Sequence, residues 1–140
     1  MKNKEPVSQI MTRHVHYVRT DEGLVQAMDI IRQHHIRHLP VIKDDQIVGI
    51  ISSTDLDRLT FSNLFENQEG SDEVILSMLS IPQVMSSKPV VVSPDTSIRE
   101  VAEIFAAKHF HSLPVVEEGK LVGIVTTTDI IRYLIDQYQE

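Results

Sequence analysis

Two stretches of this chain carry the same pattern of residues in the same order, 74 positions apart. Residues 7–60 align with residues 81–134 without a gap. The pairs that fix the alignment are Met11/Met85, Pro40/Pro114, Gly49/Gly123 and Asp55/Asp129. Because turn residues, apolar positions and an aspartate all keep register, the sequence predicts two copies of one folding unit, related by an approximate twofold axis. Functional sites should therefore come in pairs.

Composition excludes several classes of protein. The chain has 140 residues, of which 41% are hydrophobic, which is enough for one compact domain with a core. No apolar run approaches the ~18 residues needed to cross a membrane, so we expect no membrane insertion. A net charge of -7 disfavours nucleic acid as a partner. The absence of cysteine excludes disulfides, and the polar N-terminus shows no secretory signal, so we expect a cytoplasmic protein.

Each repeat begins with a short amphipathic turn that ends in methionine, which we call its opening segment (residues 7–11 and 81–85). The short stretches that follow, residues 15–18 and 90–92, are rich in β-branched residues and predict buried strands. A helix, two further strands and a second helix complete the pattern. The predicted order in each repeat is therefore strand, helix, strand, strand, helix.

The first helix of each repeat is predicted from apolar residues that recur at steps of three and four, over residues 22–33 and 96–108. These apolar residues are Leu24, Ala27, Met28 and Ile31 in one helix and Ile98, Val101, Ala102 and Phe105 in the other. Thr20-Asp21 and Ser93-Pro94-Asp95 precede the two helices, and we expect their side chains to accept hydrogen bonds from the first free amides.

Two apolar runs around a short polar connection predict a β-hairpin in each repeat. A second helix should begin directly after it, at Ser53/Thr54 and at Thr127/Thr128. The predicted hairpin strands are 39–42 with 47–51, and 113–116 with 121–125.

These elements predict an α+β fold of two β-α-β-β-α repeats. We expect repeat 1 over residues 1–60, a connecting segment over 61–78 and repeat 2 over 79–140. The apolar residues of the connecting segment suggest two helical turns around a loop. A unit of about 55 residues is only marginally stable alone, so the two repeats should pack sheet to sheet around the pseudo-twofold axis as one domain.

A hydroxyl and an aspartate follow a glycine near the end of each hairpin. Glycine weakens a strand unless something must approach its backbone closely, and here Gly49 and Gly123 interrupt apolar strands. The polar pairs that follow are Ser52 with Asp55 and Thr126 with Asp129. At the start of a helix such a pair can bind ribose hydroxyls and phosphate, or it can simply cap the helix. Both interpretations remain open from the sequence.

A basic or imidazole side chain stands two residues before each Leu-Pro. Arg37, followed by His38, corresponds to His111, followed by Ser112. Arginine and protonated histidine donate hydrogen bonds to phosphate, so we expect the ligand to be an anion. The alternative is a polar strand start at the surface.

The sequence gives little support for metal binding or catalysis. The histidines gather as His34/His35/His38, His14/His16 and His109/His111, but no HExxH pattern or cysteine accompanies them, so a metal site is disfavoured. No Walker A loop, GxGxxG or GxSxG motif is present. We expect a protein that recognises a ligand, without an obligatory cofactor, and not an enzyme.

The chain resembles a tandem pair of CBS domains, also called a Bateman module. Both repeats have the methionine that ends the opening segment, a Leu-Pro-Val strand after a helix, and a Gly-h-h-[Ser/Thr]-x-[Ser/Thr]-Asp finish, where h is apolar. The resemblance implies two clefts between the repeats that take AMP, ADP, ATP or S-adenosylmethionine. It also implies pairing of two chains into a flat homodimer.

The resemblance assigns roles to individual residues. Asp55 and Asp129 would hold ribose hydroxyls, with Ser52 and Thr126 near the ribose or phosphate. As in the γ subunit of AMP-activated kinase, the residues before Leu-Pro would contact phosphate. These are Arg37 and His111, and His38 stands beside Arg37. The adenine would rest against Val15-His16 and Pro89-Val90.

The leading hypothesis is therefore a regulatory module that binds an adenine nucleotide. Two alternatives remain. The chain can be a ligand-free dimerisation scaffold in which Asp55 and Asp129 only cap helices. It can also be the detached regulatory subunit of an enzyme or transporter, with the acidic segment 61–79 as a docking surface.

Overall fold

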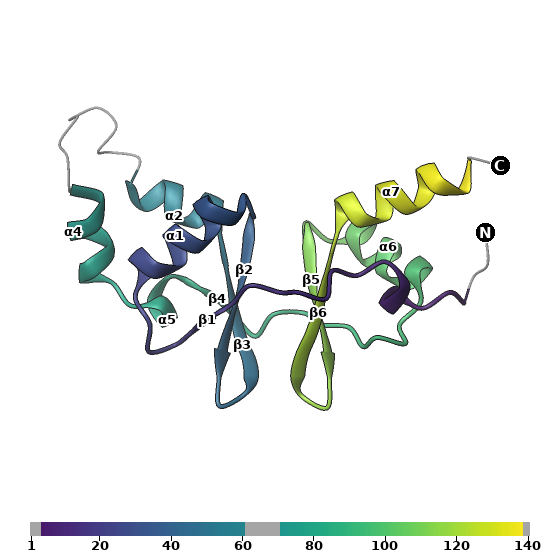
Figure 1. Ribbon diagram of the computed structural model, residues 1–140, viewed down its shortest axis with the longest axis horizontal. Helices are drawn as coiled ribbons and strands as arrows, with labels where there is room; N and C mark the ends of the chain where they lie inside the picture. The colour runs from purple at the N-terminus through teal and green to yellow at the C-terminus, as the bar shows by residue number, and fades with distance from the viewer. Residues whose placement is uncertain (1–3, 61–70, 139–140) are drawn as a thin grey trace. The chain divides into compact units, whose positions relative to one another are not determined.

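The computed structural model describes residues 4–60 and 71–138. The chain divides into two compact units, and their boundaries cut across the sequence repeats (Figure 1). The central unit is His16–Pro89, and the terminal unit combines Met1–Val15 with Val90–Glu140. The opening segment of each repeat therefore belongs to the unit that contains the hairpin of the other repeat.

The central unit is built on a four-stranded sheet in the order β1-β2-β3-β4. β1 pairs with β2 in parallel, whereas β2 with β3 and β3 with β4 are antiparallel. The elements of this unit are β1 (Val18–Arg19), α1 (Leu24–His34), β2 (His38–Lys43), β3 (Gln46–Ser52), α2 (Ser53–Thr60), α4 (Ser71–Met78), α5 (Ile81–Val84) and β4 (Ser86–Ser87).

The terminal unit repeats this plan with a smaller sheet. Its elements are η1 (Val7–Gln9), α6 (Ile98–Ala107), β5 (Ser112–Glu117), β6 (Lys120–Thr126) and α7 (Thr127–Gln137). Single bridges stand where the central unit has β1 and β4: Val92 is parallel to Val115, and Thr12 is antiparallel to Ile124. Both predicted hairpins, and the helix that follows each of them, are confirmed.

The first strand of each repeat is shorter than predicted. Instead of residues 15–18, the strand is Val18–Arg19, and instead of residues 90–92 there is one bridge at Val92. Val90 and Val91 are exposed. The pairing cannot run on far beyond Val92, because Pro94 has no N–H to donate to a neighbouring strand.

The helices α1 and α6 confirm the apolar periodicity but begin two residues later than predicted. The prediction that Thr20-Asp21 and Ser93-Pro94-Asp95 cap them is wrong, because the N-cap residues are Gly23 and Ser97. In each repeat a turn intervenes, closed by N–H···O bonds of 3.0 Å from Glu22 to Arg19 and from Thr96 to Ser93.

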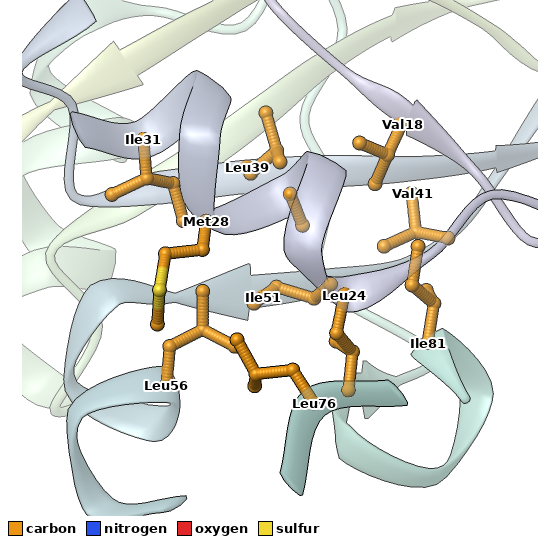
Figure 2. Close-up of a cluster of buried hydrophobic side chains, with 11 residues drawn as sticks. Val18, Leu24, Met28, Ile31, Leu39, Val41, Ile51, Leu56, Leu76 and Ile81 are labelled. Atoms are coloured by element: carbon orange, nitrogen blue, oxygen red, sulfur yellow. The ribbon is translucent and has the colours of Figure 1, made fainter. Parts of the chain in front are cut away.

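The core of the central unit is formed by side chains of α1, the four-stranded sheet, α2, α4 and α5. The predicted stripe of α1 is buried there, and Leu56 of α2 and Leu76 of α4 meet it (Figure 2). Leu76 is 2% exposed and Ile81 of the opening segment is fully buried. The helix predicted in the second half of segment 61–78 is thus confirmed as α4 and forms part of the core, whereas residues 61–70 lie outside the described residues.

The core of the terminal unit has the same design. Ile98 and Val101 of α6 are buried, and Ala102 and Phe105 pack against them, which confirms the second predicted stripe. Val7 and Met11 of the first opening segment complete this core. Opening segments are therefore structural parts of both units.

The strand glycines give space to the opening segments. An added Cβ on Gly123 would lie 2.6 Å from Met11 Sδ and 3.0 Å from the carbonyl oxygen of Thr12. On Gly49 it would lie 2.9 Å from the carbonyl oxygen of Ser86 and would also collide with Met85. The close approach expected at each glycine is thus made by a methionine and the backbone after it. These contacts account for both glycines without a ligand.

Within the terminal unit, hydrogen bonds of Glu5 join the N-terminal segment to α6 and α7. The hydroxyl of Tyr133 on α7 donates to the Glu5 carboxylate, and the N–H of Ile98 donates to the Glu5 carbonyl at 2.8 Å. The hydrogen bond to Glu5 raises the pKa of Tyr133 above 10.0, and desolvation and the negative charge of Glu5 act in the same direction. Tyr133 thus remains a hydrogen-bond donor throughout the neutral pH range. At the equivalent positions in the central unit, Leu59 and Leu79 pack against the core instead.

Candidate functional site

In the central unit, the predicted basic, hydroxyl and acidic residues meet at one end of the β2–β3 hairpin. His38 pairs with Ser52 in the antiparallel register. One residue further out, the N–H of Ser53 donates to the carbonyl of Arg37 at 2.8 Å. Asp55 lies on the first turn of α2, which begins directly after β3. The register of the hairpin therefore brings Arg37 and Asp55 to the same edge of the sheet.

The terminal unit places its counterparts in the same way. Ser112 pairs with Thr126, and the N–H of Thr127 donates to the carbonyl of His111 at 3.0 Å. Asp129 lies on the first turn of α7. The hydroxyl, the aspartate and the residue before Leu-Pro are thus held at equivalent hairpin ends in both units.

Each hydroxyl and its aspartate form a reciprocal helix cap. The N–H of Asp129 donates to Thr126 Oγ1 at 3.2 Å, and the N–H of Thr126 donates to Asp129 Oδ2 at 2.9 Å. In the central unit the N–H of Asp55 donates to Ser52 Oγ at 3.0 Å, and the return bond to Asp55 Oδ2 is 3.4 Å. Both pairs therefore have a capping function, as the structural alternative predicted.

The caps leave part of each carboxylate available. Only Oδ2 of Asp55 and Asp129 takes part in them, and within residues 4–60 and 71–138 neither Oδ1 has a hydrogen-bond partner. A carboxylate oxygen accepts up to two hydrogen bonds, so each aspartate can cap its helix and still bind a vicinal diol. The first amides of α2 and α7 add donors for an anion at the same edge.

The residues two positions before each Leu-Pro, Arg37 and His111, have side chains that can donate hydrogen bonds to an anion. Arg37 and His111 are exposed, and in the described part of the chain neither side chain has a hydrogen-bond or ion-pair partner. His38 is half-buried. The two hairpin ends thus differ, since arginine always carries its charge and histidine does so only when protonated.

The four residues predicted to contact adenine lie where the chain passes from one unit to the other. Val15 and Val90 belong to the terminal unit, and His16 and Pro89 to the central unit. The ring of His16 stacks on His34 of α1 with ring centres 3.7 Å apart. Sequence reasoning missed this contact, since nothing in the chain marks His34 as a partner of His16. The roles of all these residues toward a ligand stay predictions.

Metal ligands and membrane-spanning helices were both sought among the residues that the structure describes. No three histidine or acidic side chains among them gather in a way that can hold a metal ion. Nor is any of the described helices long and apolar enough to cross a membrane.

These features define an α+β protein with two equivalent hairpin ends, and comparison with known sequences assigns its family. The model of the CBS domain family matches residues 7–60 and 81–136, so the chain belongs to the CBS domain family. Among known proteins, MJ1225 of Methanocaldococcus jannaschii is 28% identical over 131 residues, which cover 93% of this chain and 43% of MJ1225. This chain therefore spans less than half of that relative.

Solved structures of similar proteins confirm the fold class, an α+β pair of CBS repeats. The CBS-pair protein CBSX2 from Arabidopsis thaliana superposes with a TM-score of 0.82 and 26% identity over 97% of this chain and 98% of CBSX2. CBSX2 has also been solved in complex with AMP. The CBS domain pair of protein MJ0100 has been solved in complex with 5′-methylthioadenosine and S-adenosyl-L-methionine. It matches with a TM-score of 0.72 and 25% identity, over 92% of this chain and 98% of the solved domain pair.

Proposed function

We propose that this chain is a regulatory module that binds an adenosyl nucleotide, AMP, ADP, ATP or S-adenosylmethionine, and signals its occupancy to a partner such as an enzyme or transporter. Ser52, Asp55, Thr126 and Asp129 hold the ribose and the adjoining phosphate. Arg37, His38 and His111 contact the phosphate chain or its replacement. Val15-His16 and Pro89-Val90 support the adenine.

One observation carries the proposal. In both units a backbone hydrogen bond, from Ser53 to Arg37 and from Thr127 to His111, holds a residue whose side chain can donate to phosphate at the same hairpin end as an aspartate with an Oδ1 that is unpaired among the described residues. Helix capping alone does not require that donor. The AMP bound by CBSX2 and the adenosyl compounds bound by MJ0100 support the choice of ligand class.

Changing Asp55 and Asp129 together to asparagine should weaken nucleotide binding by about tenfold to a hundredfold, because hydrogen bonds to a charged acceptor contribute about 1.5–3 kcal/mol. Asparagine retains an oxygen for the helix cap, so the melting temperature should change little. Calorimetric titration with AMP, ATP and S-adenosylmethionine measures the effect, and Asp57→Asn with Asp136→Asn is the matched control on the same two helices. Failure of the unchanged protein to bind any of the three would refute the proposal.

The reciprocal caps favour a second candidate function, the ligand-free scaffold. In that case Asp55→Ala and Asp129→Ala lower the melting temperature, at about 1 kcal/mol each, and no nucleotide binds before or after the change. The titration just described distinguishes the two functions, because the scaffold gives no binding signal for the asparagine variants to reduce.

We further propose that two copies of the chain form a homodimer through α7. Ile131, Leu134, Ile135 and Tyr138 lie at steps of three and four on one face of α7 or at its end, and all are exposed, Tyr138 by 87%. Ile131→Asp with Ile135→Asp should shift the protein to monomer in sedimentation equilibrium. Arg132→Asp, on the same helix but off this face, should leave the mass unchanged. A monomeric unchanged protein contradicts this proposal.

A further inference from the structure

The two hairpin ends have the same backbone but different side chains beside the aspartate. Both hairpins pair in the same register, and the same backbone hydrogen bond follows in each unit. Two of the side chains beside each aspartate differ between the ends, Arg37 against His111 and Ser52 against Thr126. A preference of one end for a different ligand would therefore originate in these side chains.

Arg37 gives the central unit a permanent positive charge at its hairpin end. Its side chain is exposed and, among the residues that the structure describes, has no hydrogen-bond or ion-pair partner. A guanidinium group keeps its charge at any pH at which proteins are folded, and it donates in pairs to phosphate oxygens. His111 is exposed as well, but a neutral imidazole has only one donor and carries no charge. The terminal unit thus has no permanent cation two residues before Leu-Pro.

The two hydroxyls also differ in what they can still donate. Thr126 Oγ1 accepts from the N–H of Asp129 at 3.2 Å and donates to Asp129 Oδ2 at 3.1 Å, so its proton is held by the aspartate. Ser52 Oγ accepts from the N–H of Asp55 at 3.0 Å, but within the described part of the chain it donates to no acceptor. The serine proton therefore remains available for a phosphate oxygen.

The aspartate at each end opposes a phosphate, because two negative charges repel each other at short range. In the central unit Arg37 stands at the same hairpin end as Asp55 and can offset this repulsion. In the terminal unit Asp129 acts against a phosphate, and only a protonated His111 compensates. For an adenosyl compound with an uncharged group in place of phosphate, the carboxylate is no obstacle. The charges thus favour phosphate at one end and its absence at the other.

We propose that the two hairpin ends select different adenosyl ligands and that Arg37 is the specificity-determining residue. The end in the central unit prefers an adenine nucleotide that carries phosphate, AMP, ADP or ATP. The end in the terminal unit prefers an adenosyl compound without phosphate, such as a thioether. This selectivity rests on the proposed nucleotide binding, and it gives one chain two separate inputs.

Backbone amide NMR of the full chain reports the two ends separately, through the signals of Ser53 and Thr127. ATP without magnesium and 5′-methylthioadenosine are the two probes. At the central end ATP should bind at least about tenfold more tightly than 5′-methylthioadenosine, because charge-assisted hydrogen bonds are the strong ones. At the terminal end 5′-methylthioadenosine should be the tighter ligand. Arg37→Gln should remove the preference for ATP at the central end and leave the binding of 5′-methylthioadenosine unchanged.

Two variants provide matched controls for the loss of one positive charge. Arg32 lies in the last turn of α1, and Lys108 is the C-cap residue of α6. Both are exposed and near the hairpin end in sequence, but neither precedes Leu-Pro by two residues. Arg32→Gln and Lys108→Gln should each change ATP binding by less than about twofold, because solvent and salt screen exposed charges that do not contact the ligand.

Exchange of the two residues is the decisive variant. Arg37→His with His111→Arg should transfer the preference for ATP from the central to the terminal end. The selectivity is overturned if the exchange leaves the preference in place, if ATP is preferred equally at both ends, or if either control acts as strongly as Arg37→Gln. Binding of both probes without a difference between the ends refutes only the selectivity. Absence of any binding at either end refutes the proposed function as well.

Discussion

Replacing Gly123 with alanine should lower the free energy of unfolding by about 2 kcal/mol, as expected for overpacking of a well-filled core. The added methyl group would lie 2.6 Å from Met11 Sδ and 3.0 Å from the carbonyl oxygen of Thr12. The methionine can adjust, but the backbone cannot move without loss of the two hydrogen bonds between Thr12 and Ile124, at 2.8 and 2.9 Å. Urea unfolding measures the loss, and hydrogen exchange should locate it in the terminal unit.

Gly23→Ala is the matched control for this prediction. A Cβ on Gly23 meets nothing within 4 Å, and its φ of -95° suits any residue. Alanine restricts the unfolded chain but is a poorer N-cap than glycine, and because these two effects oppose each other the stability should change by less than about 0.5 kcal/mol. A double-mutant cycle with Met11→Ala adds a second check. If Met11 causes the strain, the double variant should lose less stability than the sum of the single variants. Equal stability of Gly123→Ala and the unchanged protein would show that the opening segment does not pack against this glycine.

Leu76→Ala should cost about 3 kcal/mol of unfolding free energy, within the range for buried leucines that leave a cavity. Leu76 lies in the segment that connects the two sequence repeats, where a simple linker would tolerate the change. In the structure it is 2% exposed and belongs to the buried cluster that also contains Leu56 and Met28 (Figure 2). The loss should appear in urea unfolding and as faster hydrogen exchange of α1 and α2.

Val74→Ala provides the control on the same helix. Val74 is 58% exposed, and alanine favours a helix slightly more than valine does, so stability should stay the same or rise by a few tenths of a kcal/mol. If Leu76→Ala were as harmless as Val74→Ala, α4 would not be part of the core of the central unit.

Regular elements with strong periodicity were predictable from the sequence. The stripe of Leu24, Ala27, Met28 and Ile31 identified α1, and the apolar runs around a polar connection identified both hairpins. Each of these signals is local, because a helix or hairpin buries one face whatever else surrounds it. The hydroxyl–aspartate pairs were predictable for the same reason, since their caps join residues three positions apart.

The helix starts were not predictable to the residue, because several acceptors compete near each of them. Ser93, Thr96 and Ser97 all precede α6, and the structure uses Thr96 to close the turn and Ser97 to cap the helix. Which acceptor serves which amide depends on where Val92 joins β5. That is a contact with a residue more than twenty positions away in the chain.

By itself, the sequence determined that one folding unit occurs twice, with its hairpins, helices and capped hairpin ends, because all of these depend on short-range patterns that the 74-residue offset repeats. Only the tertiary structure decided how the chain is shared between the two units. Met11 packs against Gly123 and Met85 against Gly49, so each opening segment packs on the sheet of the other repeat. The residues that directly follow it, Thr12 and Ser86–Ser87, pair with that sheet. Both repeats have the same methionine and the same glycine, so local pattern cannot distinguish the two pairings. Long-range packing of the whole chain makes that choice.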